Sequence, residues 1–257
     1  MIPLLTAVRP NGASTTEEFE AAGGTQAVMK QLGGLMKTGA RTITGKTLCE
    51  NLASVTVADE ETIRPVSRPL GTHPTIVMLR GSLSPETSIV KLSVTEQRNL
   101  QLRGPAIVFE TALEAIDGIQ GGRVSEGQVI VLRGLGPKGT PGMGVASAVV
   151  FAVLGAGLAG KVAVVTDGQL SGLTNVGITV AEVAPEAAAG GPIGLVENGD
   201  IIAIDVEKRL ANLEVSEAEL AVRRAKLTRW ATTDERGWLA IYRDLVEPVG
   251  KGRILRR

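Results

Sequence analysis

Short apolar segments rich in β-branched residues recur from about residue 75 onward, and they restrict the possible folds more than any other feature. Each segment is bounded by Gly, Ser or Pro, which is typical of short strands. Helical spacing recurs between them, so the pattern favours an α/β domain whose strands form a barrel or a strongly curved sheet. We expect strands at residues 75–79, 89–92, 106–109, 128–132, 162–166, 201–206 and 210–215, the last two forming a hairpin.

Helix starts are indicated by a Ser or Thr followed three residues later by Glu, the spacing of a capping box. The pairs are Thr15 with Glu18, Thr111 with Glu114, and Ser216 with Glu219. They predict a short helix that Gly23–Gly24 interrupts, a helix with one apolar face at 112–119, and a final charged helix through about Trp230. Helical spacing also predicts helices at 28–36 with a stop at Gly39, near 50–52, and at 146–154.

The sequence has no internal repeat or low-complexity linker that would divide it. We therefore expect a single domain over residues 1–257. Within it, a helical N-terminal region (1–74) precedes a barrel core (75–247), and a loose basic tail (248–257) follows.

The charge balance argues against a nucleic-acid partner. The 27 basic and 27 acidic side chains give a formal net charge of zero, whereas binding to a phosphate backbone needs an excess of positive charge. Aromatic residues make up 2% of the chain, so platforms for stacking bases are not expected. Hydrophobic residues make up 44%, which is enough for a packed core.

The single cysteine, Cys49, excludes an internal disulfide framework and any all-cysteine metal site built by this chain alone. The uncharged run 141–160 is interrupted by glycines, Pro141 and Ser147, so we expect a loop, a short buried helix and a second loop rather than a membrane span. The N-terminal residues lack the basic and apolar segments of a secretory signal. These features favour a cytoplasmic protein with no membrane partner.

A glycine pattern at 155–160 (GAGLAG) fits the dinucleotide-binding fingerprint, and Lys161 makes it a near match to a phosphate-binding loop. Both mechanisms need a strand before the glycines and a helix after them, so that the helix N-terminus meets the phosphates. Here the predicted order is reversed, and Val162 replaces the hydroxyl residue of the phosphate-binding loop. The pattern therefore favours a tight helix-to-strand turn, and we expect no stabilisation by NAD or ATP.

Two loops follow predicted strands. The glycine-rich loop at 134–139 could hold an anion through backbone N–H groups and Lys138, although a purely structural loop fits the pattern as well. The loop at 167–175 presents Ser171 between small neighbours, but Asp167 and Ser171 also suit a turn in which they satisfy local backbone donors. A Ser-His-Asp triad is not expected, because the only histidine, His73, lies in a predicted surface loop.

A series of short motifs runs in order along nearly the whole chain: 8–12 (VRPNG), 21–24 (AAGG), 44–48 (TGKTL), 50–52 (ENL), 79–85 (LRGSLSP), 104–106 (GPA), 136–143 (GPKGTPGM), 166–172 (TDGQLSG), 185–188 (PEAA) and 190–193 (GGPI). Each motif is weak alone, but their shared order is specific. In this order they resemble the dihydroxy-acid dehydratase and phosphogluconate dehydratase family, which also includes sugar-acid dehydratases.

The resemblance implies that the chain corresponds to the C-terminal domain of such an enzyme, which is similar to the swivelling β-barrel domain of aconitase-like enzymes. A larger N-terminal domain normally carries the cysteines of an iron–sulfur cluster and most ligands of a divalent metal such as magnesium. Cys49 does not match a cluster ligand. The resemblance therefore implies no cofactor bound by this chain alone, a cluster-bearing N-terminal domain or subunit as partner, and a homo- or hetero-oligomer.

The family reaction removes water from a 2,3-dihydroxy carboxylate and gives a 2-oxo acid. Ser171 matches the proposed base, which takes the C2 proton as an alkoxide, while a Lewis-acid iron helps the C3 hydroxyl to leave. By the same resemblance, Lys138, Gly139, Gly172 and Thr174 are candidate substrate contacts, and no metal ligand is assigned. A serine alkoxide needs strong nearby positive charge, so we expect the isolated chain to be inactive.

Three departures from the family pattern could mark a divergent substrate class, a different metal arrangement or lost catalysis. Gly144 and Val145 stand where many relatives place a metal-binding glutamate, and residues 181–184 (AEVA) lack the histidine that many relatives have there. The serine loop reads Gln169–Leu170, where Arg-Phe is common. The alternative hypothesis is a non-catalytic binding or assembly module that keeps the fold.

Overall fold

The computed structural model describes residues 2–9, 11–92, 100–141, 145–175, 177–227, 230 and 236–256. The chain divides into two compact units at the Thr75–Ile76 boundary. The first unit contains the residues up to Thr75, and the second contains Ile76–Leu92 and the described residues from 100 onward. Each unit is described separately below.

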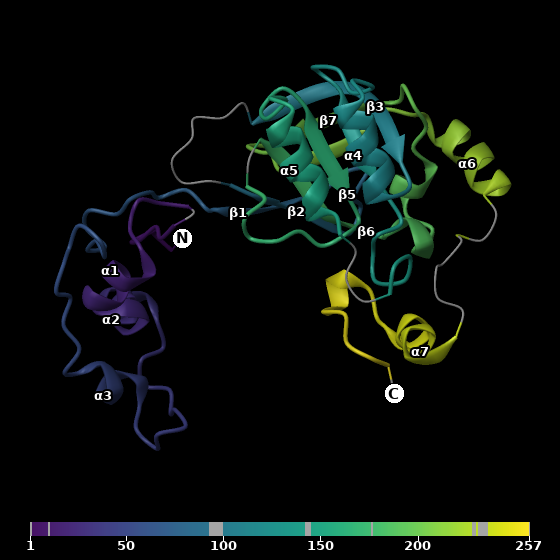
Figure 1. Ribbon diagram of the computed structural model, residues 1–257. Helices are drawn as coiled ribbons and strands as arrows, with labels where there is room; N and C mark the ends of the chain where they lie inside the picture. The colour runs from purple at the N-terminus through teal and green to yellow at the C-terminus, as the bar shows by residue number, and fades with distance from the viewer. Residues whose placement is uncertain are drawn as a thin grey trace. The chain divides into compact units, whose positions relative to one another are not determined.

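The first unit is built from short helices, drawn in purple and dark blue in Figure 1: α1 (Thr16–Ala21), α2 (Gly24–Gln31), the 3-10 turn η1 (Gly33–Leu35) and α3 (Leu48–Leu52). The predicted capping box of Thr15 and Glu18 is present at α1, and Thr47 and Glu50 form another at α3. Its small core centres on Ala22, Ala27 and Ile63.

The helix predicted over 28–36 is wrong in its length. The α-helix ends at Gln31, and Gly33–Leu35 forms the tighter 3-10 turn. Two consecutive glycines, Gly33 and Gly34, explain the change, because glycine is the least favourable residue after proline inside an α-helix.

The second unit contains one sheet of eight described strands in the order β1-β2-β6-β5-β4-β3-β7-β8. Their bounds are β1 Ile76–Leu79, β2 Thr87–Lys91, β3 Gln101–Phe109, β4 Val129–Leu132, β5 Ala163–Thr166, β6 Ile178–Ala184, β7 Ile201–Asp205 and β8 Leu210–Leu213. Four central strands run parallel to one another: β3, β4, β5 and β6. Antiparallel pairs extend the sheet on both sides, with β2 and β1 beyond β6 and with β7 and β8 beyond β3.

The two ends of the sheet meet and give it a barrel-like form. Arg80, directly after β1, forms a parallel bridge with Leu210 of β8, and its N–H donates to the carbonyl of Arg209 at 3.0 Å. The next turn also packs on β8, since the Ser82 hydroxyl donates to the carbonyl of Leu213 at 3.0 Å. The expectation of a barrel-like α/β fold with flanking helices is confirmed.

Alternate residues of the central strands face two different cores. In β4, Val129 and Val131 point into the barrel core, while Ile130 and Leu132 pack under the helices α4 (Ala112–Gln120) and α5 (Ser147–Gly155). These helices contact each other and cover one face of the sheet (Figure 1). All four residues of β4 are therefore buried, as expected for a parallel strand covered on both faces.

The sequence located most elements of the second unit but missed two of them. Strand β6 was not predicted, and a further helix, α7 (Gly237–Leu245), follows α6 (Glu217–Lys226). The helix predicted to run through about Trp230 therefore ends earlier, at Lys226, and it is not the last helix of the chain. The predicted hairpin of β7 and β8 is confirmed, and so are the side-chain caps of α4 by Thr111 and of α6 by Ser216.

The described residues of the C-terminal tail follow α7 and turn back on its end. They include the 3-10 turn η4 (Val249–Lys251), and Val246 forms a bridge with Leu255. Glu247 pairs with Lys251 at 3.4 Å and with Arg256 at 2.6 Å. No helix among the described residues is long and apolar enough to cross a membrane.

Candidate functional site

The parallel arrangement of the central strands brings several loops to one edge of the sheet. Strands β3, β4, β5 and β6 run in the same direction, so their carboxyl ends lie together. We call this the strand-end edge; it carries the loop 133–141 after β4, the loop 167–175 after β5, and the segment 185–195 after β6. Rigid strands that end in loops are a common setting for binding and catalytic groups.

Asp167 lies at the end of β5 and is completely buried. Its carboxylate accepts three backbone N–H groups, from Gly134 at 3.0 Å, Leu135 at 2.9 Å and Ala187 at 2.9 Å. Burial raises the pKa of Asp167, and the hydrogen bonds from these amides act in the opposite direction. One side chain thus connects the loops that follow β4, β5 and β6.

Glu186 is the second buried carboxylate at this edge, with 5% of its surface exposed. It accepts the amides of Lys138, at 3.0 Å and 3.2 Å to its two oxygens, and of Gly139, at 3.1 Å. Burial raises the pKa of Glu186 to about 6; the nearby Asp167 charge adds to the increase, while the two amides and the Lys138 charge oppose it. The backbone donors of the glycine-rich loop are therefore already bound to an internal anion.

Ser171 is exposed and lies in a tight turn of the loop after β5. Its Oγ accepts the Leu173 amide at 3.1 Å, and its own amide donates to Ser147 Oγ of α5 at 3.0 Å. The Thr174 hydroxyl donates to the Ser171 carbonyl at 2.7 Å. The local-turn interpretation of Ser171 is therefore confirmed, and the residue is exposed in this turn.

Two cations of this chain contact the residues just before Ser171. The Lys91 ammonium of β2 donates to the Leu170 carbonyl at 2.5 Å. Arg253 of the C-terminal tail donates to the Gln169 side chain at 3.2 Å. The serine loop is thus held by contacts from β2 and from the tail.

The predicted site residues fall into two groups. Lys138, which is half-buried, and Gly139, which is buried, belong to the loop held by Glu186. Ser171, Gly172 and Thr174 share the serine turn, in which Gly172 is exposed and Thr174 is buried. The remaining glycines of the first loop, at 142 and 144, lie outside the described residues.

Sequence reasoning missed the role of both buried carboxylates. Asp167 was expected to satisfy local donors, but its partners Leu135 and Ala187 come from other loops. Glu186 was noted only as part of a motif. A sequence signal was available for both. Asp167 comes directly after a buried strand, and Glu186 lies inside an otherwise apolar segment. An acidic residue that is buried in such a place needs several hydrogen-bond donors.

The described residues do not fit an iron–sulfur cluster or a divalent metal by themselves. No three His, Cys, Asp or Glu side chains gather as possible ligands within the described part of the chain, and Cys49 is exposed. The glycine pattern at 155–160 lies between the end of α5 and the start of β5. The predicted helix-to-strand order is thus confirmed, and it is the reverse of a nucleotide-binding turn.

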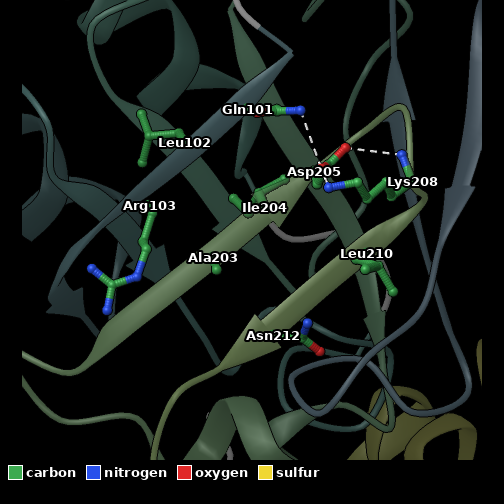
Figure 2. Close-up of a pocket in the computed structure, with 9 residues that line it drawn as sticks. All are labelled: Gln101, Leu102, Arg103, Ala203, Ile204, Asp205, Lys208, Leu210 and Asn212. Carbon is green, nitrogen blue, oxygen red and sulfur yellow. Dashed lines mark hydrogen bonds and ion pairs between the residues drawn. The ribbon is translucent and has the colours of Figure 1, made fainter.

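A shallow groove of about 440 Å³ lies over β3, β7 and β8 (Figure 2). Its polar side chains are largely paired with one another: Gln101 donates to Asp205 at 3.1 Å, and Lys208 pairs with Asp205 at 3.2 Å. None of its lining residues comes from the loops of the strand-end edge. The groove is therefore separate from the candidate site.

The fold and the site define a barrel-like α/β domain whose loops carry polar groups at one edge of the sheet. Comparison with known proteins places this chain in a hydro-lyase family. Residues 61–253 match the family model described as dihydroxy-acid/6-phosphogluconate dehydratase C-terminal, and residues 1–51 match the corresponding N-terminal model. The chain belongs to the dihydroxy-acid/6-phosphogluconate dehydratase family.

Relatives named dihydroxy-acid dehydratase align with almost the whole chain. The protein of Ignicoccus hospitalis is 41% identical over 256 residues, which cover 99% of this chain and 46% of the relative. The protein of Agathobacter rectalis is 42% identical over 255 residues, covering 98% and 45%. The chain thus spans about half the length of these relatives, and it includes a segment that matches the N-terminal family model.

Proposed function

We propose that this chain supplies the serine-bearing half of a dehydratase active site that converts a 2,3-dihydroxy carboxylate into a 2-oxo acid. The observation that carries the proposal is the exposed Ser171 turn at the strand-end edge, in a chain that belongs to a dehydratase family. The substrate class, a branched dihydroxy acid or a sugar acid, follows from the family.

Ser171 acts as the base in this proposal. Its deprotonated Oγ takes the proton from C2 of the substrate, and the electron pair of that C–H bond forms the C2–C3 double bond of the enol as the C3–O bond breaks. The C3 hydroxyl leaves as hydroxide, the proton on Oγ converts it to water, and the enol then becomes the 2-oxo acid. The amide of Leu173 already donates to Oγ at 3.1 Å, and a donor of this kind favours the deprotonated oxygen. One amide hydrogen bond stabilises a serine alkoxide only slightly, so a deprotonated Ser171 requires further positive charge nearby.

The side chain of Lys138 binds an anionic group of the substrate in this proposal. Its ammonium is the remaining donor there, because the backbone amides of Lys138 and Gly139 are bound to Glu186. In the serine turn, an added Cβ at Gly172 would face open space, and Thr174 supports the main chain of Ser171 through its hydroxyl. These residues bind and orient the substrate next to the base.

The partner is an N-terminal-type dehydratase domain or subunit that brings an iron–sulfur cluster and a divalent metal such as magnesium, so the active form is a homo- or hetero-oligomer or a longer chain. Such a centre supplies positive charge and Lewis acidity when bound. The isolated chain then has no useful base, and we expect it to be inactive alone.

The test combines the chain with a separately prepared, cluster-bearing N-terminal domain and measures 2-oxo acid formation from a branched dihydroxy acid and from a sugar acid. We expect activity above that of either part alone, and a fall in kcat of at least about 100-fold for Ser171→Ala, the usual scale for loss of a general base. Ser125→Ala is the matched control, because Ser125 is also an exposed turn serine but lies before β4.

Three results would count against the proposal. They are no gain in activity on mixing, an unchanged kcat for Ser171→Ala, and enzymatic turnover by the metal-free isolated chain. Stable binding of the N-terminal domain without turnover would favour the alternative, a non-catalytic assembly module, for which Val145 in place of a metal-binding glutamate is the motivating feature.

A further inference from the structure

Five backbone N–H groups from two segments, the loop 133–141 and the segment 185–195, converge on two buried carboxylates at the strand-end edge. Gly134, Leu135 and Ala187 donate to Asp167, and Lys138 and Gly139 donate to Glu186. Buried carboxylates with no cationic side chain in contact are uncommon in cores, because desolvating the charge is unfavourable. Packing of the core alone therefore does not explain why Asp167 and Glu186 are buried here.

The loop is shaped to fit these carboxylates closely. A Cβ at Gly136 would lie 2.2 Å from Glu186 Oε2 and 2.7 Å from Glu186 Cβ, so a larger residue there requires a shift. The loop also closes on itself, since Thr140 Oγ1 donates to the Gly134 carbonyl at 2.9 Å. The main chain at 134–140 is therefore held in two ways. Its amides donate to the two buried carboxylates, and one hydrogen bond joins the two ends of the loop.

Two charged side chains, Asp167 and Lys138, act on Glu186 in opposite directions. Asp167 lies near enough to raise the pKa of Glu186, and the Lys138 ammonium lies near enough to lower it. Arg133, at the start of the same loop, is directed elsewhere: it pairs with Glu110 at 2.6 Å and donates to the Gly194 carbonyl at 2.9 Å. Lys138 is thus the cation coupled to this carboxylate.

We propose that Asp167 and Glu186 form a carboxylate clamp that positions the Lys138 loop relative to the Ser171 turn, and that both are positioning residues for substrate binding. The clamp extends directly from the ends of β5 and β6, so it transmits the rigidity of the sheet to a loop without regular structure. This inference rests on the proposed function only for the role of Lys138; the clamp itself is a statement about the loop.

The first test measures residue-resolved amide exchange in the full chain by NMR, normalised to intrinsic rates. In Glu186→Ala, we expect the amides of Lys138 and Gly139 to lose protection by at least about 10-fold, because each loses a hydrogen bond to a charged group. Glu186→Gln should keep most of it, since the single oxygen Oε2 accepts both amides at 3.0 Å and 3.1 Å. The Leu135 amide, bound to Asp167, is the internal control.

The matched control variant is Glu126→Ala, which removes an exposed glutamate that pairs with Lys161. Protection in β4 reports whether each variant is folded. If Glu186→Ala does not fold, Glu186→Asp carries the test, because the shortened side chain keeps its charge but withdraws from the amides. Unchanged protection at Lys138 and Gly139 in the folded variant would overturn the clamp.

The second test uses the enzyme assembled with the N-terminal domain. We expect Glu186→Ala to raise KM by about 10-fold with a smaller change in kcat, and Glu186→Gln to restore KM to within about threefold of the wild type. An equal fall in kcat for both variants with KM unchanged would overturn the positioning role. If the wild-type assembly shows no turnover, the proposed function fails, while the exchange measurement still decides the clamp.

Discussion

The titration of Glu186 makes a quantitative prediction about the stability of the second unit. Burial raises the pKa of Glu186 to about 6, from an ordinary value of 4.5. The folded chain therefore binds this proton more tightly than the unfolded chain, so the contribution of Glu186 to stability is fully present below pH 4.5 and is lost as the pH rises through about 6. The difference corresponds to about 2 kcal/mol in the free energy of unfolding.

The comparison that reports this effect, together with the coupling of Glu186 to the nearby Asp167, is between the wild type and Glu186→Gln, which cannot titrate. Other carboxylates have lowered pKa values, among them Asp205, Glu214 and Glu247, and they act in the opposite direction in both proteins. The difference between the two proteins therefore removes them. We expect the stability of the wild type relative to Glu186→Gln to fall by about 2 kcal/mol between pH 4.5 and pH 7.5.

Urea unfolding followed by tryptophan fluorescence is a suitable assay. Both tryptophans, Trp230 and Trp238, belong to the second unit, so the signal reports this unit even if the first unfolds separately. A difference that stays constant across the pH range within about 0.5 kcal/mol, or that rises with pH, would refute the reasoning. A constant difference would mean that the amide donors offset burial at Glu186, and a rising one would mean that they outweigh it.

Two other substitutions test the packing of the same edge. Gly136→Ala should destabilise the second unit by about 2 kcal/mol in urea unfolding, because the new Cβ would overlap the clamp carboxylate; Gly155→Ala, where nothing lies within 4 Å of the added Cβ, should be neutral or stabilising by up to about 1 kcal/mol. Arg253→Ala removes the donor to Gln169 and should increase amide exchange in the serine loop several-fold; unchanged exchange would show that the tail does not hold this loop.

The sequence was most informative where a local signal decides the structure. Capping residues such as Thr15, Thr111 and Ser216 marked helix starts correctly, since a side chain that accepts from the third helical amide acts within one turn. Strands flanked by glycine or proline were located for the same reason. The turn between β7 and β8 was also predictable, because the two strands are adjacent in sequence and in the sheet.

Features that depend on distant partners were not predictable in the same way. Strand β6 lies between β2 and β5 in the sheet, and its left-handed residue Glu182, with φ of 54°, breaks the expected pattern of a strand. The end of α6 at Lys226 and the start of α7 also escaped detection. At the strand-end edge, Ser171 was proposed as a site residue through its motif, whereas the partners of Glu186 are defined only when the fold brings 138–139 beside it.

The glycine-rich loop shows how the fold changes the meaning of a sequence pattern. Its amides suggested a site for an external anion, yet the anion they bind is Glu186, and Asp167 adds a second buried carboxyl group nearby. Under the proposed function, an incoming substrate carboxylate meets negative charge at this loop, and the Lys138 ammonium is a cation that offsets it. The same negative charge disfavours an alkoxide at the neighbouring serine turn. In the proposed mechanism, both effects add to the need for cations from a partner domain before Ser171 acts as the base.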